Sequence, residues 1–284
     1  MFMDIEQIEL SLKERKAVCK LLERLENQPP ELENLWELMD SVWDELGCDN
    51  RRLDSRKVSD FYRHPIWLLN GLFIETHDLS IQHRLAIADW VTQNSEIYTV
   101  LDYGGGFGTL ARFIAQKNKD IVIDVYEPYP SESALIKAAN YTQISFVNTL
   151  NKRYGCLVST DVLEHVPDPL ELLAQMAKSI ELNGFLIIAN CFYPVIKCHL
   201  PCTFHLRYSF NLLAKMMGLE FITVCQNSHA SIYRKVDEAP FNWFAIRSTE
   251  LLSKTLFPIL ENSWGYRFIK STKDLVDSLR KLFF

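Results

Sequence analysis

Apolar residues recur at helical spacing along the first hundred residues of the chain. In ELENLWELMDSVWDELG, over residues 31–47, an apolar side chain returns every three or four positions, and the final glycine can end the helix. Residues 4–27 show the same period before a pair of prolines, and residues 80–93 show it again. Because no segment here alternates as a strand would, we predict an N-terminal helical region over residues 1–96.

Beyond residue 96, short β-branched runs alternate with helical ones. This alternation predicts an α/β fold with a Rossmann-like, doubly wound, mostly parallel seven-stranded sheet. The last two strands are expected to form an antiparallel pair at the sheet edge. The seven predicted strands lie within residues 98–106, 121–128, 144–150, 156–163, 185–190, 219–226 and 242–248.

The helical and sheet patterns divide the chain into three expected regions. The helical region over residues 1–96 is followed by a sheet domain over 97–250. A helical tail over 251–284 is expected to pack on the core. Its last part, STKDLVDSLRKLFF, is amphipathic, and Ser271 is suited to cap the helix.

Composition narrows the choice of partners and of compartment. The net charge of −6 makes nucleic acid an unexpected partner. No apolar run is long enough to span a bilayer, and the N-terminal residues lack the apolar centre of a signal peptide. We therefore expect a soluble, cytoplasmic protein, whose seven cysteines are buried or free thiols rather than disulfides.

The first predicted strand ends in a glycine-rich turn, VLDYGGGFGTLAR. Glycine at this place lets the backbone approach a ligand bound beyond the carboxyl ends of the strands. A dinucleotide site would need glycine or alanine where this chain has Thr109, and a P-loop would need a Gly-Lys-Ser/Thr sequence. The spacing present is Asp102-x-Gly104-x-Gly106-x-Gly108.

Three motifs together resemble those of the class I S-adenosylmethionine-dependent methyltransferases. They are the Asp-x-Gly-x-Gly-x-Gly turn, the acid Glu127 in VYEP, and STDVLEHVPDP over residues 159–169, each at the end of a predicted strand. The likeness covers about residues 97–247. The VLEHV block looks like the broad group that methylates small molecules, sugars and lipids. The sheet domain over 97–250 would then be the domain that binds S-adenosylmethionine.

The resemblance implies a role for each motif in holding the cofactor. Asp102 would meet the ammonium group of the methionine end, and Glu127 would accept hydrogen bonds from both ribose hydroxyls. Asn148 and Thr149 would flank the adenine, although many relatives carry an acid there. The expected cofactor-binding residues are Asp102, Tyr103, Gly104, Gly105, Gly106, Gly108, Glu127, Pro128, Asn148, Thr149, Asp161 and Val162.

Methylation of an alcohol requires that a base remove its proton. His165, directly after the fourth strand, and His205, after the fifth, are equally suited to that catalytic role or to a packing role. A bound metal is not expected. Cys198, His199, Cys202 and His205 lie close in sequence, but the C-x3-C spacing is not that of a common zinc site. Asp161-x-x-Glu164-His165 also resembles a divalent-ion motif of some RNA 2′-O-methyltransferases.

A small polar acceptor is the expected substrate, methylated at oxygen. By family analogy we favour a sugar or a surface-glycan precursor. The alternatives are an N- or C-methyltransferase acting on a natural-product intermediate, a catalytically silent subunit that binds a partner protein, and a nicotinamide oxidoreductase, which Thr109 disfavours. The expected acceptor-binding residues are Tyr62, His64, Tyr193, Arg207 and Tyr208.

Overall fold

A computed structural model describes residues 10–25 and 30–268 of the chain. The helix predicted over residues 271–284, with Ser271 as its cap, lies outside this range. Five helices precede the first strand, and they span Leu12–Leu22 (α1), Leu32–Glu45 (α2), Ser55–Tyr62 (α3), Ile66–Ile74 (α4) and Asp78–Gln93 (α5).

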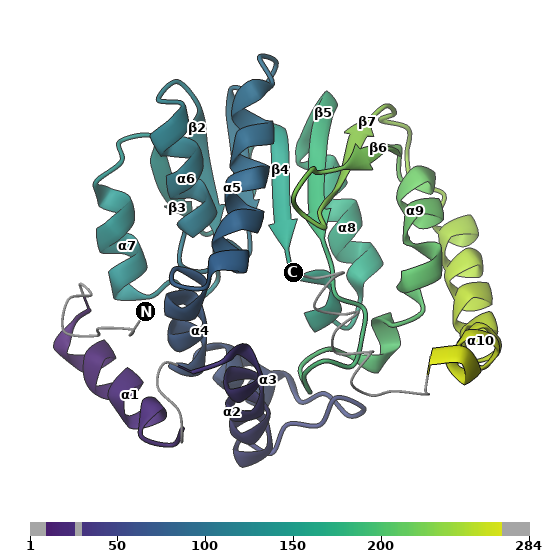
Figure 1. The fold of residues 1–284 in the computed structure, drawn as a ribbon. Coiled ribbons are helices and arrows are strands. Elements are labelled where there is room, and N and C mark those ends of the chain that lie inside the picture. Colours follow the sequence, from purple (N-terminus) through teal and green to yellow (C-terminus); the bar gives the residue numbers. More distant parts are fainter. Residues whose placement is uncertain (1–9, 26–29, 269–284) are drawn as a thin grey trace.

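Seven strands form one sheet in the order β3-β2-β1-β4-β5-β7-β6 (Figure 1). The first five are parallel to one another, and β7 runs antiparallel to both β5 and β6. The predicted fold class is therefore confirmed. The strands are Thr99–Tyr103 (β1), Val122–Tyr126 (β2), Ile144–Val147 (β3), Tyr154–Thr160 (β4), Ile180–Ala189 (β5), Leu219–Val224 (β6) and Ser231–Lys235 (β7).

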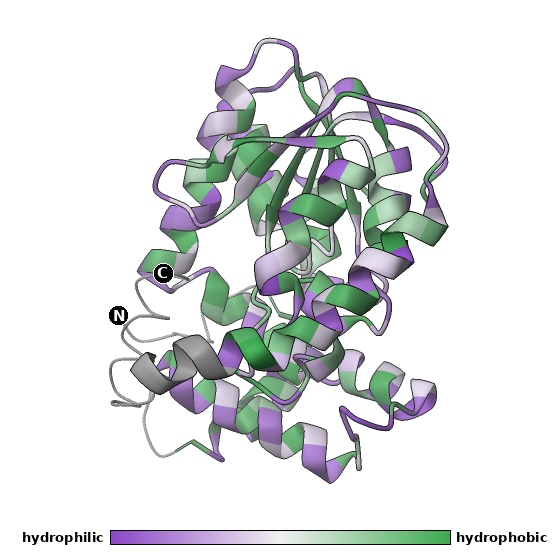
Figure 2. Ribbon diagram, turned by 90° about the vertical axis from the view of Figure 1, so that its right-hand side faces the viewer, coloured by the Kyte–Doolittle hydropathy of each residue, from purple (hydrophilic) through white to green (hydrophobic). Residues whose placement is uncertain are grey.

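Helices cover both faces of the sheet, so the central strands are apolar on each side. On one face Val100 of β1 packs with Ile87 of α5 and Ile114 of α6. On the other face its neighbour Leu101 packs with Leu173 of α8. Figure 2 shows the hydrophobic residues gathered in these strands. The helices beyond β1 are Thr109–Lys117 (α6), Glu132–Ala139 (α7), Pro169–Lys178 (α8), Leu206–Met216 (α9) and Trp243–Phe268 (α10), with 3-10 turns at Leu163–His165 (η1) and Pro201–Thr203 (η2).

Helices α1 to α4 lie beyond the carboxyl end of β4, below the sheet in Figure 1. Their apolar faces form a separate core around Leu35, Phe61 and Leu69. That core also includes Phe107 of the glycine-rich turn and Ile196 from the segment after β5. The helical region is thus packed against the edge of the sheet where the predicted ligand site lies.

The prediction for residues 242–248 was wrong, because they begin helix α10 rather than form a strand. The side chain of Asn242 accepts a hydrogen bond from the backbone N–H of Ala245 at 3.1 Å, as a helix cap does. Ile246 is buried whereas Phe244 is 85% exposed, as expected for a helix that packs one face on the core and leaves the other in solvent. The seventh strand is instead β7, which lies between β5 and β6. None of the described helices combines the length and hydropathy needed to cross a membrane.

Candidate functional site

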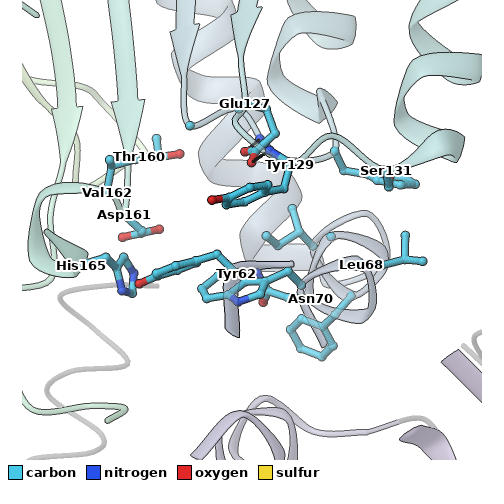
Figure 3. Close-up of a pocket in the computed structure, with 18 of the residues that line it drawn as sticks. Tyr62, Leu68, Asn70, Glu127, Tyr129, Ser131, Thr160, Asp161, Val162 and His165 are labelled. Carbon is cyan, nitrogen blue, oxygen red and sulfur yellow. Dashed lines mark hydrogen bonds between the residues drawn. The ribbon is translucent and has the colours of Figure 1, made fainter. Parts of the chain in front are cut away.

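A cavity of about 1030 Å³ lies between the carboxyl ends of the strands and the helical region. Its walls come from the glycine-rich turn, from the loops after β2, β4 and β5, and from helices α1 to α5. Figure 3 shows two groups of labelled side chains along it. Glu127, Tyr129 and Ser131 lie toward one side, and Asp161, Val162 and His165 lie toward the other.

The glycine-rich turn presents bare backbone to this cavity. Gly106 has a φ of +52°, and a Cβ built there would meet no protein atom within 4 Å. A Cβ on Gly105, by contrast, would come within 2.7 Å of both Asp102 Oδ2 and Val125 Cγ1. Gly106 therefore faces open space that a ligand can fill, whereas Gly105 is required by close packing against β1 and β2.

Asp102 at the end of β1 is a buried carboxylate with an oxygen to spare. The residue is only 2% exposed. Within the described part of the chain, its Oδ2 has no hydrogen-bond partner. Burial raises the pKa of Asp102 to about 7, against the opposing effect of the nearby Arg84 cation. A cationic group of a ligand bound next to Asp102 would stabilise the ionised carboxylate.

Arg84 of α5 lines the same part of the cavity, and the sequence analysis did not single it out. Its guanidinium donates to the carbonyl oxygen of Ser80 at 3.2 Å. Burial lowers the pKa of Arg84, whereas the charges of Asp161 and Asp102 raise it. A buried arginine that lines the cavity can bind an anionic group of a ligand, such as a carboxylate. No sequence motif marks it, since it belongs to an ordinary helical pattern.

Glu127 follows β2 and holds a defined orientation. Its Oε2 accepts from the backbone N–H of Gly106 at 3.0 Å, and its Oε1 accepts from the N–H of Tyr129 at 3.1 Å. Burial raises the pKa of Glu127, although both backbone hydrogen bonds oppose this. Tyr129 is in turn tied to the helical region, because its hydroxyl hydrogen-bonds to Ser59 of α3 at 2.9 Å. The carboxylate is thus fixed with accepting capacity left for a diol.

The turn after β4 carries Asp161 in a left-handed conformation, with a φ of +55°. Its N–H donates to the carbonyl oxygen of Ala189 on β5 at 2.9 Å, which holds the turn in place. Aspartate tolerates this region of backbone space better than most residues, and such outliers concentrate at functional sites. His165 lies four residues further on, and Figure 3 shows it beside Tyr62 and Asp161.

Two neutral histidines stand side by side at this end of the cavity. His165 Nδ1 lies 3.2 Å from the carbonyl oxygen of Cys198, and His199 Nδ1 lies 2.8 Å from that of Tyr193. The two ring centroids are 4.8 Å apart. Burial and the neighbouring imidazole lower the pKa of His165 to about 3, and burial lowers that of His199. Both rings are therefore uncharged at neutral pH.

Most of the residues expected to bind cofactor line the cavity, namely Asp102, Tyr103, Gly104, Gly105, Gly106, Glu127, Pro128, Asp161 and Val162. Tyr62, His64 and His165 line it as well. Gly108, Asn148 and Thr149 do not. Within the cavity wall, Tyr103 stacks on Tyr126 with ring centroids 4.8 Å apart, and this pair forms an aromatic surface next to Glu127.

The structure separates four other expected site residues from the cavity, namely Tyr193, His205, Arg207 and Tyr208. His205 Nδ1 hydrogen-bonds to Ser253 Oγ on α10 at 2.9 Å. Arg207 stacks on the ring of Tyr193 at 4.1 Å and forms an ion pair with Glu261 at 3.0 Å. Part of the segment after β5, including His199, does line the cavity, but His205, Arg207 and Tyr208 lie at the start of α9, which packs against α10.

Comparison with protein families identifies the cofactor that suits this geometry. The family model described as a methyltransferase domain matches residues 15–195, more than half of the chain. The chain belongs to this methyltransferase family. It is a class I S-adenosylmethionine-dependent methyltransferase domain, and the prediction of S-adenosylmethionine as its cofactor is confirmed.

The methyltransferase is similar to curated proteins named ubiquinone biosynthesis O-methyltransferase. It is 26% identical over 145 residues to that of Saccharophagus degradans, a match that covers 46% of this chain and 60% of that protein. It is 26% identical over 136 residues to that of Aliivibrio fischeri, covering 44% and 56%. The chain thus spans less than two thirds of the length of these relatives.

Among solved structures, the methyltransferase is similar to an O-methyltransferase family protein from Burkholderia thailandensis. The two share 13% identity at a TM-score of 0.48, over 72% of this chain and 71% of the other. It is also similar to a sugar N-methyltransferase from Streptoalloteichus, with 10% identity and a TM-score of 0.42, over 54% of this chain and 88% of the other.

Proposed function

We propose that this methyltransferase transfers a methyl group to a hydroxyl oxygen of a small polar acceptor. The observation that carries the proposal is the pair of imidazoles, His165 and His199, which line the cavity next to Asp161 and whose Nδ1 atoms face backbone carbonyls, so that Nε2 of each ring is the accepting atom. S-adenosylmethionine supplies an activated methyl group when bound. An alcohol must lose its proton as it is methylated, so an oxygen acceptor needs a basic surface beside it. An amine acceptor would not need one.

The binding of the cofactor is proposed to follow the polar groups along the cavity. Glu127 holds the ribose hydroxyls, and Asp102 and Arg84 hold the ammonium and carboxylate groups of the methionine end. These opposite charges suit the two ends of an amino acid. In this arrangement the reacting methyl points toward Asp161 and His165. The acceptor then occupies the remaining space under the helical region.

The acceptor space suits a hydroxylated ring. Tyr62 and Trp67 line it, with ring centroids 5.1 Å apart, and each makes an edge contact with His165. Trp67 Nε1 is buried without a hydrogen-bond partner in the described structure, so it can donate to a bound ligand. Aromatic walls bind both sugars and planar rings through their apolar faces. A sugar or surface-glycan precursor therefore stays the favoured acceptor class, and the names of the curated relatives add an intermediate of ubiquinone biosynthesis.

The proposal is tested with labelled S-adenosylmethionine and a panel of sugar nucleotides, free sugars, catechols and primary amines. The expected product carries the label as an O-methyl group, located by mass spectrometry and NMR. The His165→Ala variant should lose about 100-fold or more in kcat while its affinity for S-adenosylhomocysteine stays close to that of the wild type. His205→Ala is the matched control, since that histidine lies away from the cavity. A product methylated only at nitrogen or carbon, or an unaffected His165→Ala variant, would contradict the assignment.

A further inference from the structure

Helix α10 lies at the outer edge of the sheet domain, beside α9 (Figure 1). The residues that face the domain recur every three or four positions along it. Ile246 is fully buried. Ser253 donates a hydrogen bond to Ser209 of α9 at 2.8 Å. The ring centroid of Phe257 lies 6.2 Å from that of Tyr208, also on α9. One side of α10 therefore holds the helix to the rest of the domain.

The opposite side of α10 is apolar and exposed. Five large apolar side chains fall within an arc of about 140°, because an α-helix turns by about 100° per residue. We call these residues the outer face, and they are Phe244, Leu251, Leu252, Leu256 and Ile259, each at least 42% exposed. A helix on the surface of a soluble domain normally carries polar and charged residues on the side away from the core. The outer face of α10 departs from that pattern.

The charged residues of α10 between positions 244 and 260 all lie off the outer face. They are Arg247, Glu250 and Lys254, and they form ion pairs with one another and with Asp168 at 2.5–2.8 Å. A helix that binds a membrane surface carries cations toward anionic headgroups. Here both cations are paired with carboxylates, and the chain has a net charge of −6. The outer face therefore suits neither a membrane nor a partner selected by charge, whereas two copies of it meet without repulsion.

The outer face is self-complementary in its spacing. A seam of side chains runs along it at steps of three or four residues, through Phe244, Ser248, Leu251, Thr255 and Ile259. This is the spacing at which two helices pack on each other. The serine and the threonine are small, so they permit helix axes about 8–10 Å apart. In an antiparallel pair, the midpoint of the seam falls at Leu251 and Leu252, and each of these residues meets its own counterpart at the twofold axis.

The size of the outer face is sufficient for a dimer contact. Its five side chains expose roughly 500–600 Å², which is as large as the largest apolar patch on most monomeric proteins. Two copies would together bury roughly 1,000–1,200 Å², the lower limit for a specific interface between proteins. An interface of this size holds a reversible dimer rather than an obligate one.

We propose that the outer face of α10 joins two copies of this chain in a twofold-symmetric dimer, with the two α10 helices antiparallel. None of the described residues of α10 lines the cavity. The contact therefore uses no residue of the methyl-transfer site, and the inference does not rest on which acceptor is methylated.

The test measures the mass of the full chain by sedimentation velocity and light scattering over about 1–50 µM, the range in which an interface of this size dissociates. We expect the 33.0 kDa chain to form a species of twice that mass as its concentration rises. Leu252→Lys and Leu252→Glu each place two like charges at the twofold axis, so each variant alone should stay monomeric. An equimolar mixture of the two should restore the dimer, because a lysine then meets a glutamate.

Leu135→Lys is the matched control. Leu135 is also an exposed leucine on a helix, but α7 packs beside β3 at the opposite edge of the sheet. This variant should dimerise as the wild type does. Because Leu252 is exposed, both Leu252 variants should keep the circular dichroism spectrum of the wild type and its affinity for S-adenosylhomocysteine.

Three results would overturn the dimer contact. They are a wild type that is monomeric at about 50 µM, two Leu252 variants that each dimerise alone, and a mixture of these variants that stays monomeric. A monomeric wild type would leave the outer face to residues 269–284 of the same chain or to a different partner.

Discussion

Replacing Glu127 tests the cofactor site most directly. Both carboxylate oxygens already accept one backbone N–H, from Gly106 at 3.0 Å and from Tyr129 at 3.1 Å. Their remaining lone pairs are the ones proposed for the ribose hydroxyls. In Glu127→Gln the amide NH₂ must face one of these N–H groups whichever way the amide is turned. The substitution therefore removes one acceptor and sets two donors against each other.

The magnitude follows from the number of hydrogen bonds lost. A hydrogen bond to a charged group contributes about 1.5–3 kcal/mol. Glu127→Ala loses two of them, at least about 3 kcal/mol, which weakens the Kd for S-adenosylhomocysteine by ~100-fold or more. Glu127→Gln loses one, and a weakening of about 10-fold is expected. Isothermal titration calorimetry measures both values.

Glu96→Gln is the matched control, because Glu96 lies on the surface in an exposed ion pair with Arg234. Its affinity for S-adenosylhomocysteine should equal that of the wild type. The reasoning is refuted when folded Glu127→Ala protein binds within about threefold of the wild type, a difference of less than 1 kcal/mol. That result would mean that the ribose is held elsewhere in the cavity.

Three further predictions concern the same end of the sheet. Gly105→Ala should destabilise the fold by about 1–3 kcal/mol in chemical denaturation, because its Cβ would lie 2.7 Å from Val125 Cγ1; an unchanged midpoint would show that the turn can shift. The pKa of Asp102 is raised, so its contribution to stability is present at low pH and lost as the pH rises through about 7. The free energy of unfolding of Asp102→Asn, relative to that of the wild type, should therefore increase between acid and neutral pH. Free energies of unfolding that change with pH in the same way in both proteins would contradict this. Arg84→Ala should weaken the binding of S-adenosylhomocysteine by about 10-fold but leave unchanged the binding of 5′-methylthioadenosine, which has no carboxylate. An equal loss of affinity for both ligands would mean that Arg84 does not hold the carboxylate.

The parallel part of the sheet could be predicted because its central strands are buried on both faces, so they read as apolar runs that alternate with helical segments. The edge could not. Residues 242–248 are rich in aromatic and β-branched side chains, which favour a strand, but the cap at Asn242 and the packing of Ile246 on α9 and the sheet make them a helix. The strand β7, SIYRK, has only two apolar residues and ends in two cations, so the sequence pattern does not mark it as a strand.

By itself, the sequence determined the fold class, the family and the strand ends at which Asp102, Glu127 and Asp161 lie. These depend on local periodicity and on motifs that are contiguous in the chain. The tertiary structure alone decided which other residues share the cavity. It brought Arg84 to the part of the cavity that Asp102 lines and His199 to His165 across 34 positions of the chain, and it turned His205 and Arg207 toward α10. Such encounters depend on how helices and loops pack, and no local pattern records them.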